Sequence, residues 1–159
     1  LLRAAKKQGT EFGKLVATYM DQGRLVPDDV MVKMIGERLS ESDCADGCLL
    51  DGFPRTVNQA SALDGVLAKH NQQVDVVIEL DCDDDVLIRR LSQRAQEEGR
   101  ADDTPETIAF RQKSFRKKTR PVLDYYREKG LLHVVDGMQS RDEVFGEIWQ
   151  IIEAKQQDS

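Results

Sequence analysis

The stretch LLDGFPRTVNQA at residues 49–60 joins the end of an apolar run to the beginning of a helical pattern. The run itself, CLLD at 48–51, suits a short strand that is buried on both faces. Two further runs of this kind are VDVVIELDC at 74–82 and LLHVVDG at 131–137. Helical patterns separate the three runs, and this alternation of strand and helix predicts an α/β fold with a parallel sheet covered by helices.

Apolar residues recur with helical spacing in six segments, and the sequence predicts helices there. The six segments cover residues 2–20, 27–39, 56–70, 84–98, 105–129 and 141–157. Thr104 followed by Pro105 is a good cap and first-turn pair, and SRDE at 140–143 fits a capping box. The polar stretch RAQEEGRADDT at 94–104 joins two long helices and contains Gly99, so it predicts a mobile lid hairpin.

Composition limits the class of protein. The 159 residues, 40% hydrophobic and 33% charged, are enough for one well-packed domain. The apolar runs are far shorter than the roughly 20 residues that cross a bilayer, and the N-terminus lacks a signal-peptide pattern. Three cysteines form no metal-like cluster and are too few, and odd in number, for a disulfide framework. The net charge of −6 gives no general reason to expect nucleic acid or a membrane surface as partner. From the lack of membrane and signal patterns we expect a cytoplasmic protein. We also expect a monomer.

The corner at 51–56 is the first candidate site, because ligands of open parallel sheets bind beyond the carboxyl ends of the strands. Gly52 allows the backbone to approach a ligand, Pro54 stiffens the turn, and Arg55 carries a planar fork that suits phosphate. Asp51 can hold a metal ion through water, since Mg²⁺ keeps much of its hydration shell. The alternative interpretation is an ordinary strand-to-helix turn with a surface salt bridge.

Six motifs occur in the order and spacing of one protein family. They are LLR at 1–3, GRLVPD at 23–28, DGFPRTVNQA at 51–60, RLSQR at 90–94, GRADDTPETI at 99–108 and VVDG at 134–137. Over essentially the whole chain they resemble the adenylate kinase family, in the form whose short lid lacks a zinc-binding insertion. The resemblance implies a P-loop nucleotide kinase fold that transfers a phosphoryl group from MgATP to AMP, giving two ADP. It also implies one nucleotide kinase domain over 1–159, with an AMP-binding helical segment at 1–27 and a short lid at 94–104.

The resemblance assigns residues to AMP. It places Arg3 and Arg55 on the AMP phosphate, and it places Gln59 at the edge of the adenine. The backbone around Arg24, Leu25 and Val26 would close over the same base. The full set implied for AMP is Arg3, Arg24, Leu25, Val26, Gly52, Phe53, Pro54, Arg55, Gln59, Arg100 and Arg111.

A second set is implied for ATP and for the transfer itself. Arg90 would pack on the ATP base, Arg94 would hold ATP phosphates, and the backbone carbonyl of Gln139 would meet the base. Arg100 and Arg111 would reach the transferring phosphoryl group and act with Arg55 as the catalytic residues. Phosphoryl transfer requires alignment of two nucleotides and neutralisation of phosphate charge, which convergent arginines and Mg²⁺ provide.

Each assignment has a structural alternative. Arg90 and Arg94 lie four apart on a charged helix and can form a solvated face. Gln59 follows Thr56 by three residues and can be the far end of a capping box. DCDDD at 81–85 resembles a cation site, but its carboxylates also suit the N-terminus of the next helix. Trp149, on the apolar side of the last helix, is expected in the core.

A nucleotide kinase of this type needs a glycine-rich phosphate loop, G-x-x-x-x-G-K-[ST], and the sequence contains none. The resemblance implies two strands, this loop and a helix ahead of Leu1, with the first strand between those at 48–51 and 74–82. We therefore expect the sequence to be incomplete, and the chain alone to be inactive. One alternative is a kinase for UMP or CMP, which Gln59 disfavours. Another is a non-catalytic nucleotide-binding protein or scaffold without the loop, and a third is an isolated fragment with no function of its own.

Overall fold

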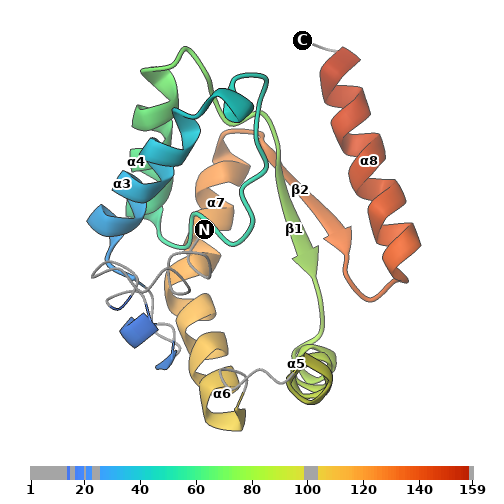
Figure 1. Cartoon of the computed structure of the whole chain (residues 1–159). Coiled ribbons are helices and arrows are strands. Elements are labelled where there is room, and N and C mark those ends of the chain that lie inside the picture. The colour runs from blue at the N-terminus through green and yellow to red at the C-terminus, as the bar shows by residue number, and fades with distance from the viewer. Residues whose placement is uncertain (1–13, 15–16, 20, 23–25, 99–103, 158–159) are drawn as a thin grey trace. The chain divides into compact units, whose positions relative to one another are not determined.

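The structure is a computed structural model that describes residues 14, 17–19, 21–22, 26–98 and 104–157 (Figure 1). The chain divides into two compact units. The first comprises Leu1–Leu49 and Ile88–Arg116, and the second comprises Leu50–Leu87 and Lys117–Ser159. The α/β class predicted from the sequence is confirmed, with helices and a small parallel sheet.

In the first unit, helix α3 (Asp28–Leu39) begins directly after Pro27. Its buried residues Met31, Ile35 and Leu39 are spaced by four, so they form one apolar face. Two aspartates in the first turn favour the positive end of the helix dipole. A 3-10 turn, η1 (Ser42–Cys44), follows. The helix predicted at 27–39 is confirmed.

Helix α5 (Asp84–Glu98) has the predicted bounds, and it passes from the second unit into the first. Residues 94–98 of the predicted lid are therefore helical, because RAQEE contains no glycine or proline and consists of helix-forming residues. Residues 99–103, the remainder of the lid before Thr104, lie outside the described residues. The lid stays a prediction.

The helical segment predicted at 105–129 is confirmed over residues 105–128, but it is not α-helical throughout. Helix α6 (Pro105–Ser114) is capped by Thr104, whose hydroxyl accepts the Thr107 N–H at 3.2 Å. A π-helical turn, η2 (Phe115–Thr119), follows, and then helix α7 (Arg120–Glu128). Pro121 explains the interruption, because it has no N–H to donate to the carbonyl four residues earlier and its ring crowds that carbonyl.

The second unit contains strands β1 (Val77–Asp81) and β2 (Leu132–Asp136), which pair in parallel. The register sets Val77 opposite Leu132 and Asp81 opposite Asp136. Both strands lie within runs predicted as strands. The strand predicted at 48–51 is wrong, because those residues have no strand assignment. A strand exists through hydrogen bonds to a neighbour, and no described strand runs beside this segment.

The core of the second unit joins two helices to one face of the strand pair. Ala60 of α4 (Val57–Ala68) is buried together with Val122 and Tyr126 of α7. Leu132 of β2 and other partly buried apolar residues pack against this cluster. Helix α8 (Arg141–Gln157) contacts β2, and Figure 1 shows it along one side of the strands, with α4 and α7 on the other. The capping box predicted at its start is confirmed, since the Ser140 N–H donates to Glu143 Oε2 at 2.9 Å.

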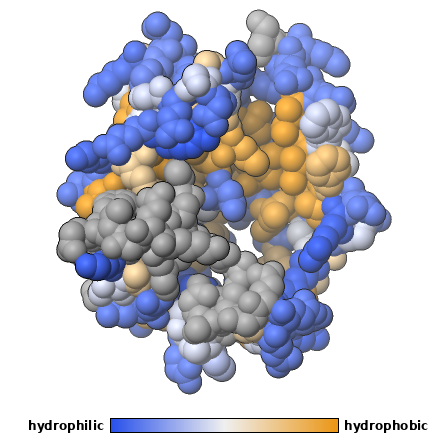
Figure 2. All heavy atoms as spheres, viewed as in Figure 1, coloured by the Kyte–Doolittle hydropathy of each residue, from blue (hydrophilic) through white to orange (hydrophobic). Residues whose placement is uncertain are grey.

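Hydrophobic side chains also reach the surface of this unit. Figure 2 shows them as a band over the strands and α8. Trp149 is 51% exposed and stacks on Phe145, with 6.2 Å between the ring centroids. The prediction that Trp149 lies in the core is therefore wrong. Helix α8 contacts β2, but the part of α8 that carries Phe145 and Trp149 is exposed. No helix among the described residues is long and apolar enough to cross a membrane.

Candidate active site

The corner ahead of α4 holds the Arg55 side chain against its own turn. Arg55 Nε donates to the Gly52 carbonyl at 2.7 Å. Gly52 has a φ of +72°, a left-handed conformation that side-chain-bearing residues rarely adopt. A Cβ at Gly52 would lie 2.9 Å from Arg55 Nη2. Gly52 therefore serves both the turn and the close approach of the guanidinium.

The backbone of Arg55 is held from two other elements. Its N–H donates to Oε1 of Gln59, a residue of α4, at 2.7 Å. Its carbonyl accepts a hydrogen bond of 3.0 Å from the hydroxyl of Thr119, the last residue of η2. Side chains from two elements thus fix both polar groups of this residue's backbone, and Arg55 itself is exposed. A side chain that must hold a phosphate in one orientation requires a backbone that is fixed in this way.

Gln59 is the buried partner of this corner, with 2% of its surface exposed. Its N–H donates to the Thr56 hydroxyl at 3.1 Å, and Thr56 is the N-cap of α4. Its side chain reaches back to Arg55, one residue further than in an ordinary capping box. The Thr56 half of the predicted capping box is therefore confirmed, while the Gln59 carboxamide accepts from the Arg55 N–H. A contact with an adenine edge stays a prediction.

The other residues predicted at this corner lie with Arg55. Phe53 is buried, Pro54 is half-buried, and a cis peptide bond joins them. Asp51 is exposed at the start of the corner. No group of three or more metal-ligating side chains gathers among the described residues. A single exposed carboxylate suits Mg²⁺, which keeps several waters and takes its other ligands from phosphates.

Gln139, predicted on the ATP base, follows β2 in the same unit. Its side chain donates to Glu147 of α8 at 2.8 Å, and its N–H donates to the Asp136 carbonyl at 3.4 Å. These two bonds fix the turn between β2 and α8. The backbone carbonyl of Gln139 is the group that the prediction assigns to ATP.

The remaining predicted residues belong to the first unit. Val26 is buried, with 5% exposed. Arg90 and Arg94 lie one turn apart on α5, and Arg111 lies on α6. The residues of the Arg55 corner all lie in the second unit, whereas these three arginines lie in the first. Four predicted residues lie outside the described residues: Arg3, Arg24, Leu25 and Arg100.

An ionic cluster ties α4 to α7 within the second unit. Asp64 accepts a hydrogen bond from the Tyr125 hydroxyl at 2.6 Å and another from Lys129. The ammonium of Lys129 also lies 4.4 Å from the centre of the Tyr125 ring. The hydrogen bond to Asp64 raises the pKa of Lys129 above its usual range. Because α4 begins after Arg55 and α7 begins after Thr119, this cluster helps to keep those two residues together.

Sequence reasoning missed Thr119 and this cluster. Their partners lie 61 to 65 residues away along the chain, so no local pattern reports them. Pro121 was the one available signal, since a proline within a helical pattern predicts an interruption beside Thr119.

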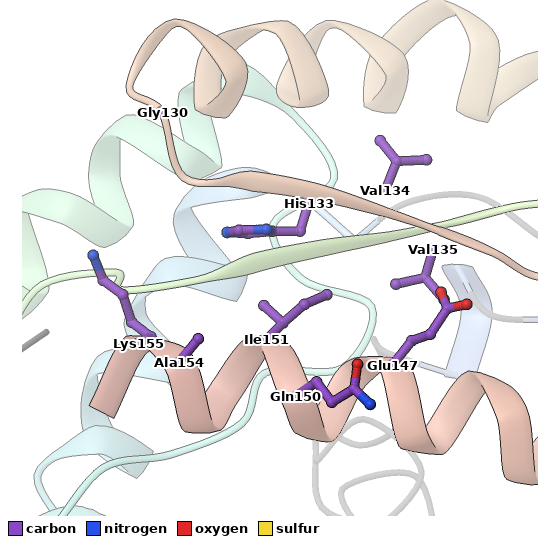
Figure 3. A pocket seen from close by; sticks show the side chains of 9 residues that line it. All are labelled: Gly130, His133, Val134, Val135, Glu147, Gln150, Ile151, Ala154 and Lys155. Atoms are coloured by element: carbon purple, nitrogen blue, oxygen red, sulfur yellow. The ribbon is translucent and has the colours of Figure 1, made fainter. Parts of the chain in front are cut away.

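A separate hollow of about 530 Å³ lies between β2 and α8. Figure 3 shows His133 of the strand and Ile151 of the helix extending into it. Glu147 and Lys155 contribute charged groups to its lining. None of the residues predicted for nucleotide binding lines it, so it is distinct from the Arg55 corner.

Parallel strands, covering helices and an arginine corner ahead of a helix define an α/β nucleotide-binding class. A sequence model of the family described as Adenylate kinase matches residues 1–131. The chain belongs to the adenylate kinase family, and the resemblance found in the sequence is confirmed. It is accordingly an enzyme of the nucleoside monophosphate kinase class.

Individual relatives agree. The adenylate kinase of Stenotrophomonas maltophilia (strain K279a) is 46% identical over 154 residues, which cover 97% of this chain and 82% of the relative. The adenylate kinase of Parvibaculum lavamentivorans (strain DS-1 / DSM 13023 / NCIMB 13966) is 46% identical over 155 residues, which cover 96% of this chain and 76% of the relative. The adenylate kinase of Maricaulis maris (strain MCS10) is 46% identical over 155 residues, which cover 98% of this chain and 82% of the relative.

Proposed function

We propose that this protein transfers a phosphoryl group from MgATP to AMP, giving two ADP. Family membership supports the reaction, and the observation that carries the residue assignment is the fixed Arg55 corner. The planar guanidinium matches two phosphate oxygens at once, which a flexible ammonium does not. A phosphate held by Arg55 would therefore sit in one orientation relative to α4.

The same corner supports the choice of acceptor. Gln59 lies on the first turn of the helix that follows Arg55, so a nucleotide held at its phosphate by Arg55 can direct its base toward α4. A carboxamide offers an acceptor and donors together, which matches the amine and ring nitrogen of adenine. We place Arg3 beside the AMP phosphate, and the backbone of Arg24, Leu25 and Val26 over the base.

On the donor side, we assign the ATP base to Arg90 and to the Gln139 carbonyl. Arg94 would hold ATP phosphates, and Arg100 and Arg111 would neutralise charge on the group in transfer. Mg²⁺ would be held through water by Asp51 and would supply further charge neutralisation at the phosphates. The odd number of cysteines argues against a disulfide framework, which supports a reducing compartment such as the cytoplasm. A monomer is our expectation for the oligomeric state.

The test is ADP formation by the full product of the gene that encodes this sequence, here called the full-length protein. ATP is offered with AMP, CMP or UMP, and the 159-residue chain alone is assayed beside it. We expect AMP to be the preferred acceptor of the full-length protein. The 159-residue chain should form no ADP above a blank, because it has no glycine-rich loop for ATP phosphates.

Other outcomes select the alternatives. A preference for CMP or UMP would identify a different nucleoside monophosphate kinase. ATP binding without ADP formation would identify a non-catalytic nucleotide-binding protein. Turnover by the 159-residue chain would refute the need for the loop.

A further inference from the structure

The hydroxyl of Thr119 donates to the Arg55 carbonyl at 3.0 Å across 64 residues of sequence. Within a helix, a threonine hydroxyl commonly bonds a carbonyl of its own preceding turn. Thr119 instead bonds the corner that carries Arg55. It ends the π-helical turn η2, a kind of irregularity that occurs often at functional sites.

The frame around this bond is well packed. Val122 and Tyr126 of α7, one and two turns after Thr119, bury against Ala60 of α4. Asp64 adds its bonds to Tyr125 and Lys129 from the same pair of helices. The helix that carries Thr119 and the helix that follows Arg55 are therefore fixed to each other within one unit.

Three bonds then converge on one residue. Gln59 holds the Arg55 N–H, Thr119 holds the Arg55 carbonyl, and the Gly52 carbonyl holds Arg55 Nε. The first two fix the backbone from which the side chain starts, and the third fixes the direction of its guanidinium. Removal of the Thr119 bond would take away the hold that η2 has on this backbone.

We propose that Thr119 is a positioning residue for phosphoryl transfer, which aims the Arg55 guanidinium by holding the Arg55 carbonyl. The inference rests on the proposed role of Arg55 at the acceptor phosphate. Thr119 itself touches no reacting atom in this account. A small misalignment of a phosphate ligand affects the transition state more than the binding of the substrate, since the transition state requires the stricter geometry.

The kinetic test uses three substitutions in the full-length protein. Thr119→Val keeps the shape of the side chain without its hydroxyl, and Thr119→Ser restores the hydroxyl. Ser40→Ala is the matched control, because it removes a hydroxyl that donates to the Gly36 carbonyl at 2.9 Å within the first unit. Thr119→Val should lower kcat about tenfold with a smaller change in KM for AMP, while Thr119→Ser and Ser40→Ala stay within about twofold. A normal kcat in Thr119→Val, or equal loss in Thr119→Ser, would overturn the proposal.

A double substitution tests whether the effect passes through Arg55. In an Arg55→Lys background, Thr119→Val should cause little further loss of kcat, since the group it aims is already gone. Losses that multiply fully would show that Thr119 acts by another route.

An NMR readout separates this inference from the proposed reaction. The heteronuclear NOE of the Arg55 Nε–Hε group reports how rigidly the guanidinium is held. It should fall in Thr119→Val and recover in Thr119→Ser, even in a protein without turnover. An unchanged NOE would overturn the positioning role, whereas loss of ADP formation in the unsubstituted full-length protein would refute only the reaction.

Discussion

Gln59 Oε1 accepts the backbone N–H of Arg55 at 2.7 Å, and this bond joins the first turn of α4 to the corner before it. The amide of Gln59 is 2% exposed, so water does not readily replace it as the partner of Arg55. The residue predicted to read the acceptor base therefore also supports Arg55, the residue proposed to bind the acceptor phosphate. Substitutions at Gln59 should affect stability and selectivity together.

Gln59→Leu tests this double role. It should lower the free energy of unfolding by about 1–3 kcal/mol, because the part-buried N–H of Arg55 loses this acceptor. It should also erode the preference for AMP over CMP and UMP in kcat/KM. Asn58→Leu is the control, since Asn58 is exposed on the same turn and should change neither. Unchanged kcat/KM ratios with lowered stability would mean that Gln59 only supports the corner.

Two glycines separate backbone strain from the position of Arg55. Gly52 and Gly130 both have positive φ, at +72° and +69°. A Cβ at Gly52 would meet Arg55 Nη2 at 2.9 Å, whereas a Cβ at Gly130 would meet nothing within 4 Å. Both alanine variants should lose about 1–2 kcal/mol of stability from the strained backbone. Only Gly52→Ala should lower kcat strongly, because it displaces the guanidinium. Equal kcat in the two variants would contradict this account.

Adjacent tyrosines on α7 give opposite predictions for stability. The Tyr126 hydroxyl is buried with no partner among the described residues, while the Tyr125 hydroxyl bonds Asp64. Tyr126→Phe should therefore be neutral or stabilising, and Tyr125→Phe should cost about 1 kcal/mol in urea unfolding.

The pH dependence of Tyr126→Phe follows from burial, which raises the pKa of the Tyr126 phenol to about 12. An unfolded tyrosine ionises near its ordinary pKa of about 10, so the unsubstituted protein loses stability as the pH rises from 10 toward 12. The advantage of Tyr126→Phe should grow over that range. A constant difference between pH 8 and pH 11 would show that the folded phenol ionises normally.

Elements with local signals were predictable from the sequence. Helix α3 follows Pro27 and has two aspartates in its first turn, helix α4 follows its N-cap Thr56, and the box Ser140–Glu143 opens α8. Each signal lies within a few residues of the feature that it marks, so periodicity and capping chemistry suffice. The Arg55 corner was found for a similar reason, since its glycine, proline and arginine are contiguous.

The features that sequence missed depend on distant partners. Residues 48–51 have the composition of a strand, but a strand also needs a neighbour to pair with. Trp149 has the spacing of a core residue, but its burial depends on what packs against α8. Thr119 meets Arg55 only because Pro121 interrupts the helical pattern and α7 packs on α4. Periodicity describes one element at a time and does not contain these relationships.

The central claim is that the planar guanidinium of Arg55, held by its corner, aligns the acceptor phosphate for transfer. The most direct measurement is kcat of the full-length Arg55→Lys variant at saturating ATP and AMP. Lysine keeps the charge but not the fork, so kcat should fall by about tenfold to a hundredfold. Arg141→Lys, at the exposed start of α8, should stay within about twofold of the unsubstituted protein. A near-normal kcat in Arg55→Lys would show that charge alone suffices and would contradict the account.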